Sequence, residues 1–202
     1  MKPSVPAPPV PLVQPDRSEQ GTAAPRAASR FDRHELPLSV CQKPLLLVDV
    51  DGVISLFGFA PDERPEGDFV LVDGIGHLLS AEAGPHLLDL ATTFELVWCT
   101  GWEERANEYL PAALGLPGPL PYLSFEHKPA GGRPHWKLPA VDAYAGPDRP
   151  LAWIDDAHDA ESRAWAARRP GPALLVDTEP ATGITAAHVH RLKEWENRLH
   201  AQ

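Results

Sequence analysis

The sequence predicts an α/β fold, a Rossmann-like parallel sheet with helices on both faces. Three observations lead to this prediction: apolar runs of strand length recur, helical segments separate them, and three of the runs end in polar residues suited to chemistry. Near-continuous apolar strands that alternate with helices are typical of a parallel sheet buried on both faces. Such sheets bind ligands at the carboxyl ends of their strands.

The expected elements alternate along the second part of the chain. Strands are expected over 44–50, 94–100, 150–156 and 172–178. Helices are expected over 84–92, 102–110, 136–144, 159–169 and 185–200. Pro139 would interrupt the third of these helices, and Thr185 is a plausible N-cap for the last.

Residues 1–42 form a Pro/Ala-rich leader that precedes the domain of residues 43–202. The leader has eight of the 24 prolines and neither helical nor strand periodicity, so we expect it to be disordered. The alternative function for it is a proline-rich ligand for a protein partner with an aromatic groove.

Composition and charge limit the classes of function. The 202 residues are 43% apolar and 23% charged, no window approaches a membrane span, and the N-terminus lacks a secretory signal. Two cysteines, Cys41 and Cys99, are too few for a disulfide framework, so a cytoplasmic location is expected. Residues 43–202 have 13 basic and 24 acidic side chains. An acidic domain argues against non-specific nucleic-acid binding, but it is compatible with a metal held by acidic ligands.

Carboxylates follow two of the expected strands. Asp49 and Asp51 end the first strand and point the same way, because side chains at i and i+2 of a strand share a face. Asp155 and Asp156 end the third strand, and Thr100 with Gly101 ends the second. Parallel strands bring these ends to one rim of the sheet, where crowded carboxylates need a cation, a proton or a reaction. For Asp155 and Asp156, the alternative role is to cap the N-terminus of the following helix, but Asp159 suits that role better.

The segments "LLLVDVDGV", "VWCTG", a later lysine and "AWIDD" resemble, in order and spacing, the four motifs of the haloacid-dehalogenase (HAD) superfamily. The resemblance covers about residues 43–200. It implies an HAD-like sheet in which the 44–50 strand lies between the 94–99 and 150–155 strands, as right-handed crossovers also favour. Three segments, "VWCTGWEERANEYL", "LAWIDD" and "TGITAAHVHRLKEW", also look like the HAD domain of bacterial "Swiss Army Knife" RNA-repair proteins.

The resemblance implies a Mg²⁺-dependent phosphatase with an aspartyl-phosphate intermediate. Asp49 would be the nucleophile and Asp51 the general acid and base. Asp49, the backbone carbonyl of Asp51 and Asp155 would hold Mg²⁺, with Asp156 bound directly or through water. Thr100 and the amide of Gly101 would bind the phosphoryl oxygens.

Three further residues have open assignments. Lys137 lies 18 residues before Asp155 and is preferred over Lys128 as the phosphate-binding lysine. Trp102 could stack on a base or sugar of the substrate, or pack against the core. Cys99 lies in an apolar strand and is expected to be an inert buried thiol.

The segment between Asp51 and Thr100 leaves about thirty residues beyond one helix and one strand, with strand-like 68–74 among them. This length predicts a small β-hairpin flap and no large cap domain. The interval from Thr100 to Asp155 is expected to hold a helix, a strand and a helix. The resulting open site would admit a small phosphorylated molecule, a nucleic-acid end or a phosphoprotein. Two alternatives stay open: a binding or scaffold protein that has lost turnover, and a phosphotransferase with an acceptor other than water.

The leader is expected to be dispensable for the domain. Deleting residues 1–40 should leave both the melting temperature and the phosphatase activity unchanged, because the leader has too few large apolar side chains to offset its ordering entropy. Thermal unfolding and an activity assay on the full and shortened chains measure this. A fall of several degrees in melting temperature would show that the leader packs on the domain.

Overall fold

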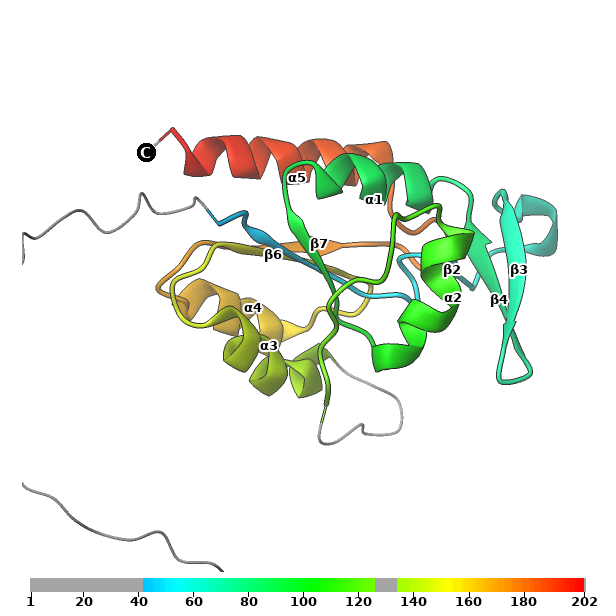
Figure 1. Cartoon of the computed structure of the whole chain (residues 1–202), viewed down its shortest axis with the longest axis horizontal. Coiled ribbons are helices and arrows are strands. Elements are labelled where there is room, and N and C mark those ends of the chain that lie inside the picture. The colour runs from blue at the N-terminus through cyan, green and yellow to red at the C-terminus, as the bar shows by residue number, and fades with distance from the viewer. Residues whose placement is uncertain (1–41, 126–133, 202) are drawn as a thin grey trace, which may run out of the picture. The chain divides into compact units, whose positions relative to one another are not determined.

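The computed structural model describes residues 42–125 and 134–201, and it has an α/β architecture (Figure 1). Four strands form a parallel sheet in the order β5-β1-β6-β7: β1 (Leu45–Val48), β5 (Glu95–Trp98), β6 (Leu151–Asp155) and β7 (Ala173–Asp177). All four predicted strands are confirmed, and so is the central place of β1. The leader lies outside the described residues except for Gln42.

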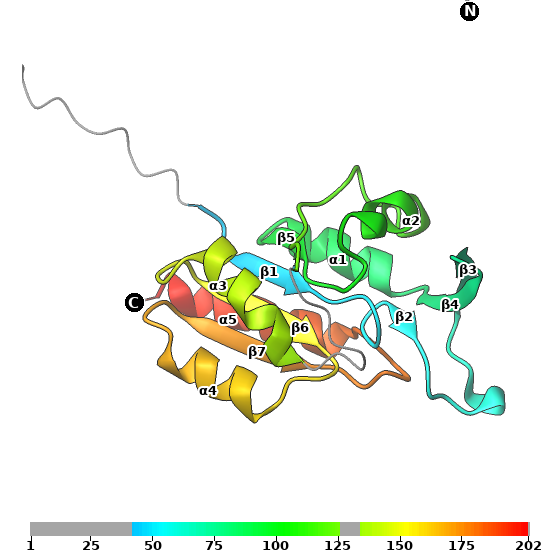
Figure 2. The same cartoon turned by 90° about the horizontal axis from the view of Figure 1, so that it is seen from below.

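Helices cover both faces of the sheet, α1 and α5 on one side and α3 and α4 on the other (Figures 1 and 2). The α-helices are α1 (Ala83–Ala91), α2 (Ala106–Ala113), α3 (Leu138–Ala145), α4 (Ala160–Arg168) and α5 (Ala186–Leu199). Short 3₁₀ helices are η1 (Pro61–Glu63), η2 (Glu103–Arg105) and η3 (Pro134–Lys137). Among the described helices, none is long and apolar enough to cross a lipid bilayer.

The side chains of β1 explain why its sequence is continuously apolar. Leu46 and Val48 belong to the core cluster that includes residues of α1 and α5, whereas Leu45 and Leu47 belong to the cluster that includes residues of α3 and α4. All four side chains are fully buried. A strand buried on both faces has no polar side, and it therefore lacks the alternation of a half-exposed strand.

The predicted helix starts are confirmed in two cases and corrected in one. Asp159 is the N-cap of α4 and accepts hydrogen bonds from the amides of Glu161 and Ser162. Thr185 is the N-cap of α5. Pro139 does not interrupt α3, because it lies in the first turn, where its missing N–H has no intrahelical partner to lose.

A second, antiparallel sheet follows the carboxyl end of β1, with the order β2-β4-β3 (Figure 2). It consists of β2 (Ser55–Leu56), β3 (Gly67–Val72) and β4 (Ile75–Ser80), and β3 with β4 is the predicted hairpin. The strand-like segment 68–74 ends earlier than expected. Asp73 and Gly74 have φ of 52° and 81° and form the two-residue turn, a conformation that Asp-Gly pairs favour. The short strand β2 was not predicted.

The strand expected between α2 and α3 is reduced, within residues 114–125, to a single bridge. Tyr122 bridges Trp98 in parallel, and the Trp98 amide donates to the carbonyl of Pro121. Prolines at 117, 119 and 121 remove amide donors, so a longer ladder cannot form along this segment.

Asn107 of α2 fixes this segment to the edge of the sheet. Its Oδ1 accepts from Trp98 Nε1 and from the Leu120 amide at 2.9 Å each, and its Nδ2 donates to the Leu120 carbonyl at 2.8 Å. We expect Asn107→Ala to destabilise the fold by about 2–3 kcal/mol, since three partner groups lose their bonds in a half-buried place. Urea unfolding measures this. Glu108→Ala, one exposed position along the same helix, is the control and should change stability by less than about 0.5 kcal/mol.

Candidate active site

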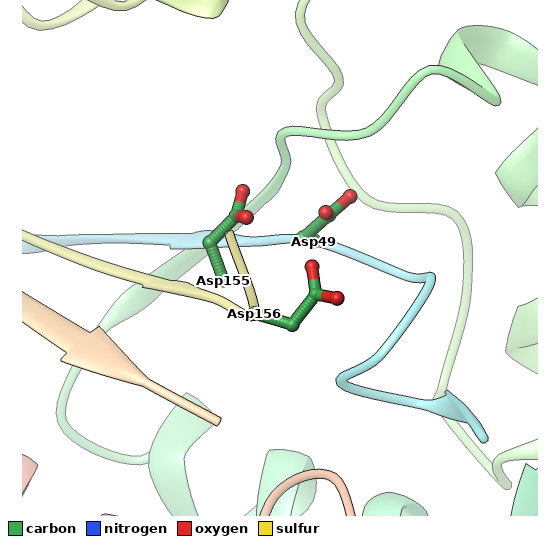
Figure 3. Close-up of side chains that lie close together, drawn as sticks. All are labelled: Asp49, Asp155 and Asp156. Carbon is green, nitrogen blue, oxygen red and sulfur yellow. The ribbon is translucent and has the colours of Figure 1, made fainter. Parts of the chain in front are cut away.

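The carboxyl ends of neighbouring strands bring three carboxylates together. Asp49 follows β1, Asp155 ends β6 and Asp156 follows it; one oxygen of each lies within 4.8 Å of the others. Figure 3 shows the three side chains lying close together. Asp49 and Asp155 are 7% and 1% exposed, so these two carboxyl groups are held out of water. The convergence expected from the sequence is therefore present.

Lys137 is the cation of this cluster. It lies at the junction of η3 and α3 and is 4% exposed. Its Nζ is 2.9 Å from Asp49 Oδ2 and 2.7 Å from Asp155 Oδ2, so one ammonium bridges the ends of β1 and β6. The competing residue, Lys128, lies outside the described residues. Lys137 therefore belongs to the same cluster as the carboxylates at the ends of β1 and β6.

Asp155 has most of its hydrogen-bonding capacity occupied. Besides Lys137, Trp153 Nε1 donates to Oδ2 at 3.1 Å and the Ala157 amide donates to Oδ1 at 3.0 Å. A carboxylate held by three donors is fixed in orientation. The sequence favoured Asp155 over Asp156 as the direct metal ligand, and these contacts show that Asp155 also positions Lys137.

Asp156 lies directly against the backbone of Gly52. A Cβ at Gly52 would lie 2.4 Å from Asp156 Cγ, and the φ of Gly52 is 73°. Both facts require glycine at this position. The Gly52 carbonyl accepts from the buried Thr178 hydroxyl at 2.8 Å, which fixes the turn after β1 to the end of β7. Gly52 of the DxDG segment thus leaves space for the carboxylate of Asp156, which belongs to the DD segment at the end of β6.

The buried charges do not balance, because three carboxylates face one ammonium. Burial, followed by the charge of Asp155, raises the pKa of Asp49 to about 8 although Lys137 opposes the shift. Burial and Asp155 likewise raise the pKa of Asp156 to about 6. Burial alone would lower the pKa of Lys137, but Asp49 and Asp155 beside it raise that pKa above its ordinary value. An additional cation would relieve the excess negative charge.

The donor set suits a hard divalent cation. The cluster offers carboxylate oxygens only, which are the ligands that Mg²⁺ prefers, and one oxygen from each of three residues can face a common point. The excess of carboxylates over ammonium gives the electrostatic reason for such an ion. The Asp51 side chain is not part of this group of carboxylates. The sequence predicted only the backbone carbonyl of Asp51 as a Mg²⁺ ligand.

The Asp51 side chain points to a different set of partners. Trp102 Nε1 donates to Asp51 Oδ2 at 3.0 Å, and His77 Nδ1 lies 3.7 Å from Asp51 Oδ1. His77 Nδ1 is also 2.9 Å from the Ser55 hydroxyl, and its ring packs against that of Trp102 in a T-shaped arrangement with 4.7 Å between the ring centroids. Half of the Asp51 side chain is exposed. Trp102 therefore packs partly on the core and also holds Asp51. The sequence predicted either stacking on the substrate or packing on the core, and neither prediction included the contact with Asp51.

Thr100, Gly101 and Cys99 lie at the end of β5 as expected. Thr100 is buried, and its Oγ1 accepts from the Trp102 amide at 3.3 Å, which leaves its O–H as a donor. Gly101 is exposed beside it. Cys99 is fully buried, and burial raises the pKa of its thiol well above the ordinary value, so the prediction of an inert thiol is supported.

Sequence reasoning missed several residues that support the site. Trp153 precedes Asp155 by two positions on β6, and the shared face of i and i+2 could have indicated their contact. Thr178 and His77 gave no local pattern, because they meet Gly52 and Asp51 only through the tertiary fold.

No family model matches the chain, and no curated protein is significantly similar to it in sequence.

The raised pKa values make a prediction about stability. A carboxyl group whose pKa is higher in the folded than in the unfolded state favours folding at low pH and loses that contribution as the pH rises through its folded pKa. For Asp49 and Asp156 the loss falls between about pH 4 and pH 8. In EDTA, Asp49→Asn should therefore melt at least about 2 °C above wild type at pH 8, and the difference should shrink steadily as the pH falls toward 5.

Differential scanning fluorimetry from pH 5 to pH 8 measures this difference, and Mg²⁺ should reverse it at pH 8 by stabilising only the wild type. Asp51→Asn is the matched control, since it removes a half-exposed carboxylate from the same segment. A pH-independent difference between Asp49→Asn and wild type would contradict the assignment of a strained buried carboxylate.

Proposed function

We propose that the chain is a Mg²⁺-dependent phosphatase of the HAD type that forms an aspartyl-phosphate on Asp49. The observation that carries this proposal is the meeting of Asp49, Lys137 and Asp155 at the carboxyl ends of β1 and β6, with Asp156 beside them. A nucleophilic carboxylate, a buried cation and a set of oxygen ligands are what phosphoryl transfer through a carboxylate requires.

The arrangement of the motifs supports the HAD assignment beyond the α/β fold. The DxDG segment follows the central strand β1, the threonine follows the neighbouring strand β5, and the DD segment ends β6 on the other side. The lysine reaches between the first and last of these segments from the start of α3. The β3–β4 hairpin is inserted between the first two motifs, where a small flap is expected.

In the first half-reaction, an Asp49 oxygen forms a bond to phosphorus and the bond from phosphorus to the leaving oxygen breaks. Lys137 and the Thr100 hydroxyl bind the negative oxygens of the transferring group. Asp155 acts through Lys137, because it fixes the ammonium that it contacts at 2.7 Å. The proton of the departing alcohol comes from Asp51.

In the second half-reaction, a water molecule attacks the phosphorus of the aspartyl-phosphate. Asp51, now a carboxylate, takes a proton from this water, and the carboxylate of Asp49 and inorganic phosphate are released. The half-exposed side chain of Asp51 suits a group that exchanges protons with solvent. Its bond from Trp102 Nε1 holds it beside, and not within, the buried cluster.

Asp49, Asp156 and the backbone carbonyl of Asp51 would hold Mg²⁺, with Asp155 as a further oxygen donor. When bound, the ion supplies positive charge that offsets the carboxylates and the phosphate oxygens.

Replacing the proposed nucleophile distinguishes an enzyme from a binding protein. Asp49→Asn should keep the fold and abolish turnover, because an amide is a poor nucleophile and a poor Mg²⁺ ligand. Phosphate release from an activated aryl phosphate, followed with and without Mg²⁺, measures this. If wild type releases no phosphate with Mg²⁺ and Asp49→Asn alters only stability, a scaffold function replaces the phosphatase.

Asp51→Asn should have a different effect, because the nucleophile survives. We expect turnover to fall about a hundredfold to ten-thousandfold, with the smallest loss for aryl phosphates, whose leaving groups need little protonation. A phosphoenzyme trapped by acid quench should be present in Asp51→Asn, absent in Asp49→Asn and dependent on Mg²⁺. Equal losses for alkyl and aryl phosphates would contradict the general-acid role.

A further inference from the structure

A cavity of about 560 Å³ lies beside Asp51, between the β3–β4 hairpin and η2. The two elements that enclose it are far apart in sequence, and in Figure 1 the hairpin lies next to α2, which follows η2 directly. A volume of this size is in the range of about 300–1,000 Å³ that small organic ligands occupy. The lining includes Asp51, Val72, Asp73, Ile75, His77 and Trp102. Because Asp51 is part of the lining, the cavity opens beside the proposed general acid.

The walls of the cavity are partly apolar. Ile75 is 63% exposed although it is a large aliphatic side chain on a strand, and it pairs with Val72 across the hairpin. Trp102 lies on the η2 side, with its indole fixed by Asp51 at 3.0 Å and by the His77 ring at 4.7 Å. An exposed aliphatic residue and a fixed indole that line the same cavity offer apolar contacts to a ligand.

The tip of the hairpin is attached to η2 by an ion pair between Arg105 and Asp73. Among the described residues of the lining, Arg105 is the only arginine or lysine, and its guanidinium is used by Asp73. Four lining residues are acidic, among them Asp51 and Glu104. The lining therefore opposes a leaving group that carries further phosphates, such as the remainder of a polynucleotide.

We propose that this cavity binds the alcohol portion of a small phosphate monoester, an uncharged organic group with an apolar ring. This inference rests on the proposed phosphatase function and names its substrate class. When the bond from phosphorus to the ester oxygen breaks, Asp51 gives its proton to that oxygen, and the free alcohol remains between Ile75 and Trp102 until it leaves. A polynucleotide end is the competing substrate class.

Filling the cavity tests the proposal. Ile75→Trp should lower the ratio of kcat/KM for 1-naphthyl phosphate to kcat/KM for acetyl phosphate by about tenfold or more, because only the naphthyl group needs the space. Leu71→Trp is the matched control. Leu71 is 70% exposed on the same hairpin, but it alternates with Val72 and so points to the opposite face. It should leave the ratio unchanged, and melting temperatures verify that both variants fold.

An unchanged ratio in Ile75→Trp would overturn the proposal. So would faster hydrolysis by wild type of a 5′-phosphorylated oligonucleotide than of 1-naphthyl phosphate, which would favour the polynucleotide class. Binding of 1-naphthol, measured by saturation-transfer NMR, does not require catalysis. It therefore distinguishes a failure of the cavity proposal from a failure of the proposed phosphatase function. If wild type hydrolyses neither phosphate but binds 1-naphthol, and Ile75→Trp alone loses that binding, the cavity is an organic binding site and only the phosphatase function fails. If wild type neither hydrolyses the phosphates nor binds 1-naphthol, both proposals fail.

Discussion

The buried ammonium of Lys137 between Asp49 and Asp155 is the interaction on which the rest of the site depends. A charge taken out of water costs several kcal/mol unless partners replace its hydration, and removing one partner of such a pair leaves another charge unpaired. The fold therefore has to bring three chain segments to one point: the end of β1, the end of β6 and the start of α3. The parallel order β5-β1-β6 does this, because it sets the carboxyl ends of β1 and β6 side by side.

The same constraint explains details around the cluster. Gly52 has no Cβ because Asp156 occupies the space, and Thr178 holds the resulting turn through the Gly52 carbonyl. Trp153, although it lies in the core, directs its single N–H to Asp155. A buried carboxylate satisfied by an indole, an amide and an ammonium has little freedom to move. The site is thus rigid on the side of β6, while the half-exposed Asp51 lies on the side of the hairpin.

The sequence predicted the parts of the structure that depend on local pattern. The four strands, the five helices and the N-caps Asp159 and Thr185 follow from apolar runs and capping residues, and their ends differ by only a few residues. Asp49, Asp155 and Asp156 could be predicted together because parallel strands meet at one edge, whereas Lys137 was predicted from its spacing before Asp155. His77 and Ser55 could not, since their contacts with each other and with Asp51 depend on how the hairpin packs. Within residues 114–125, the strand expected before α3 is reduced to one bridge because prolines remove amide donors. The strand β2, two residues long, is too short to give a pattern.

The charge of the cluster also bears on how a site of this kind would bind phosphate. A phosphate monoester would add negative charge to a cluster in which three carboxylates already face one ammonium, and buried like charges repel strongly because little water screens them. Lys137 cannot offset this alone, since both of its contacts are to carboxylates. On the proposed function, phosphate binding would therefore depend on a cation, or on protons taken up by Asp49 and Asp156, whose pKa values are raised by burial and then by the charge of Asp155. Protonated Asp49 is not a nucleophile, so only the cation leads to reaction. On the proposed function, the imbalance of charge that costs stability in the metal-free protein is what makes the site selective for a metal-bound phosphate.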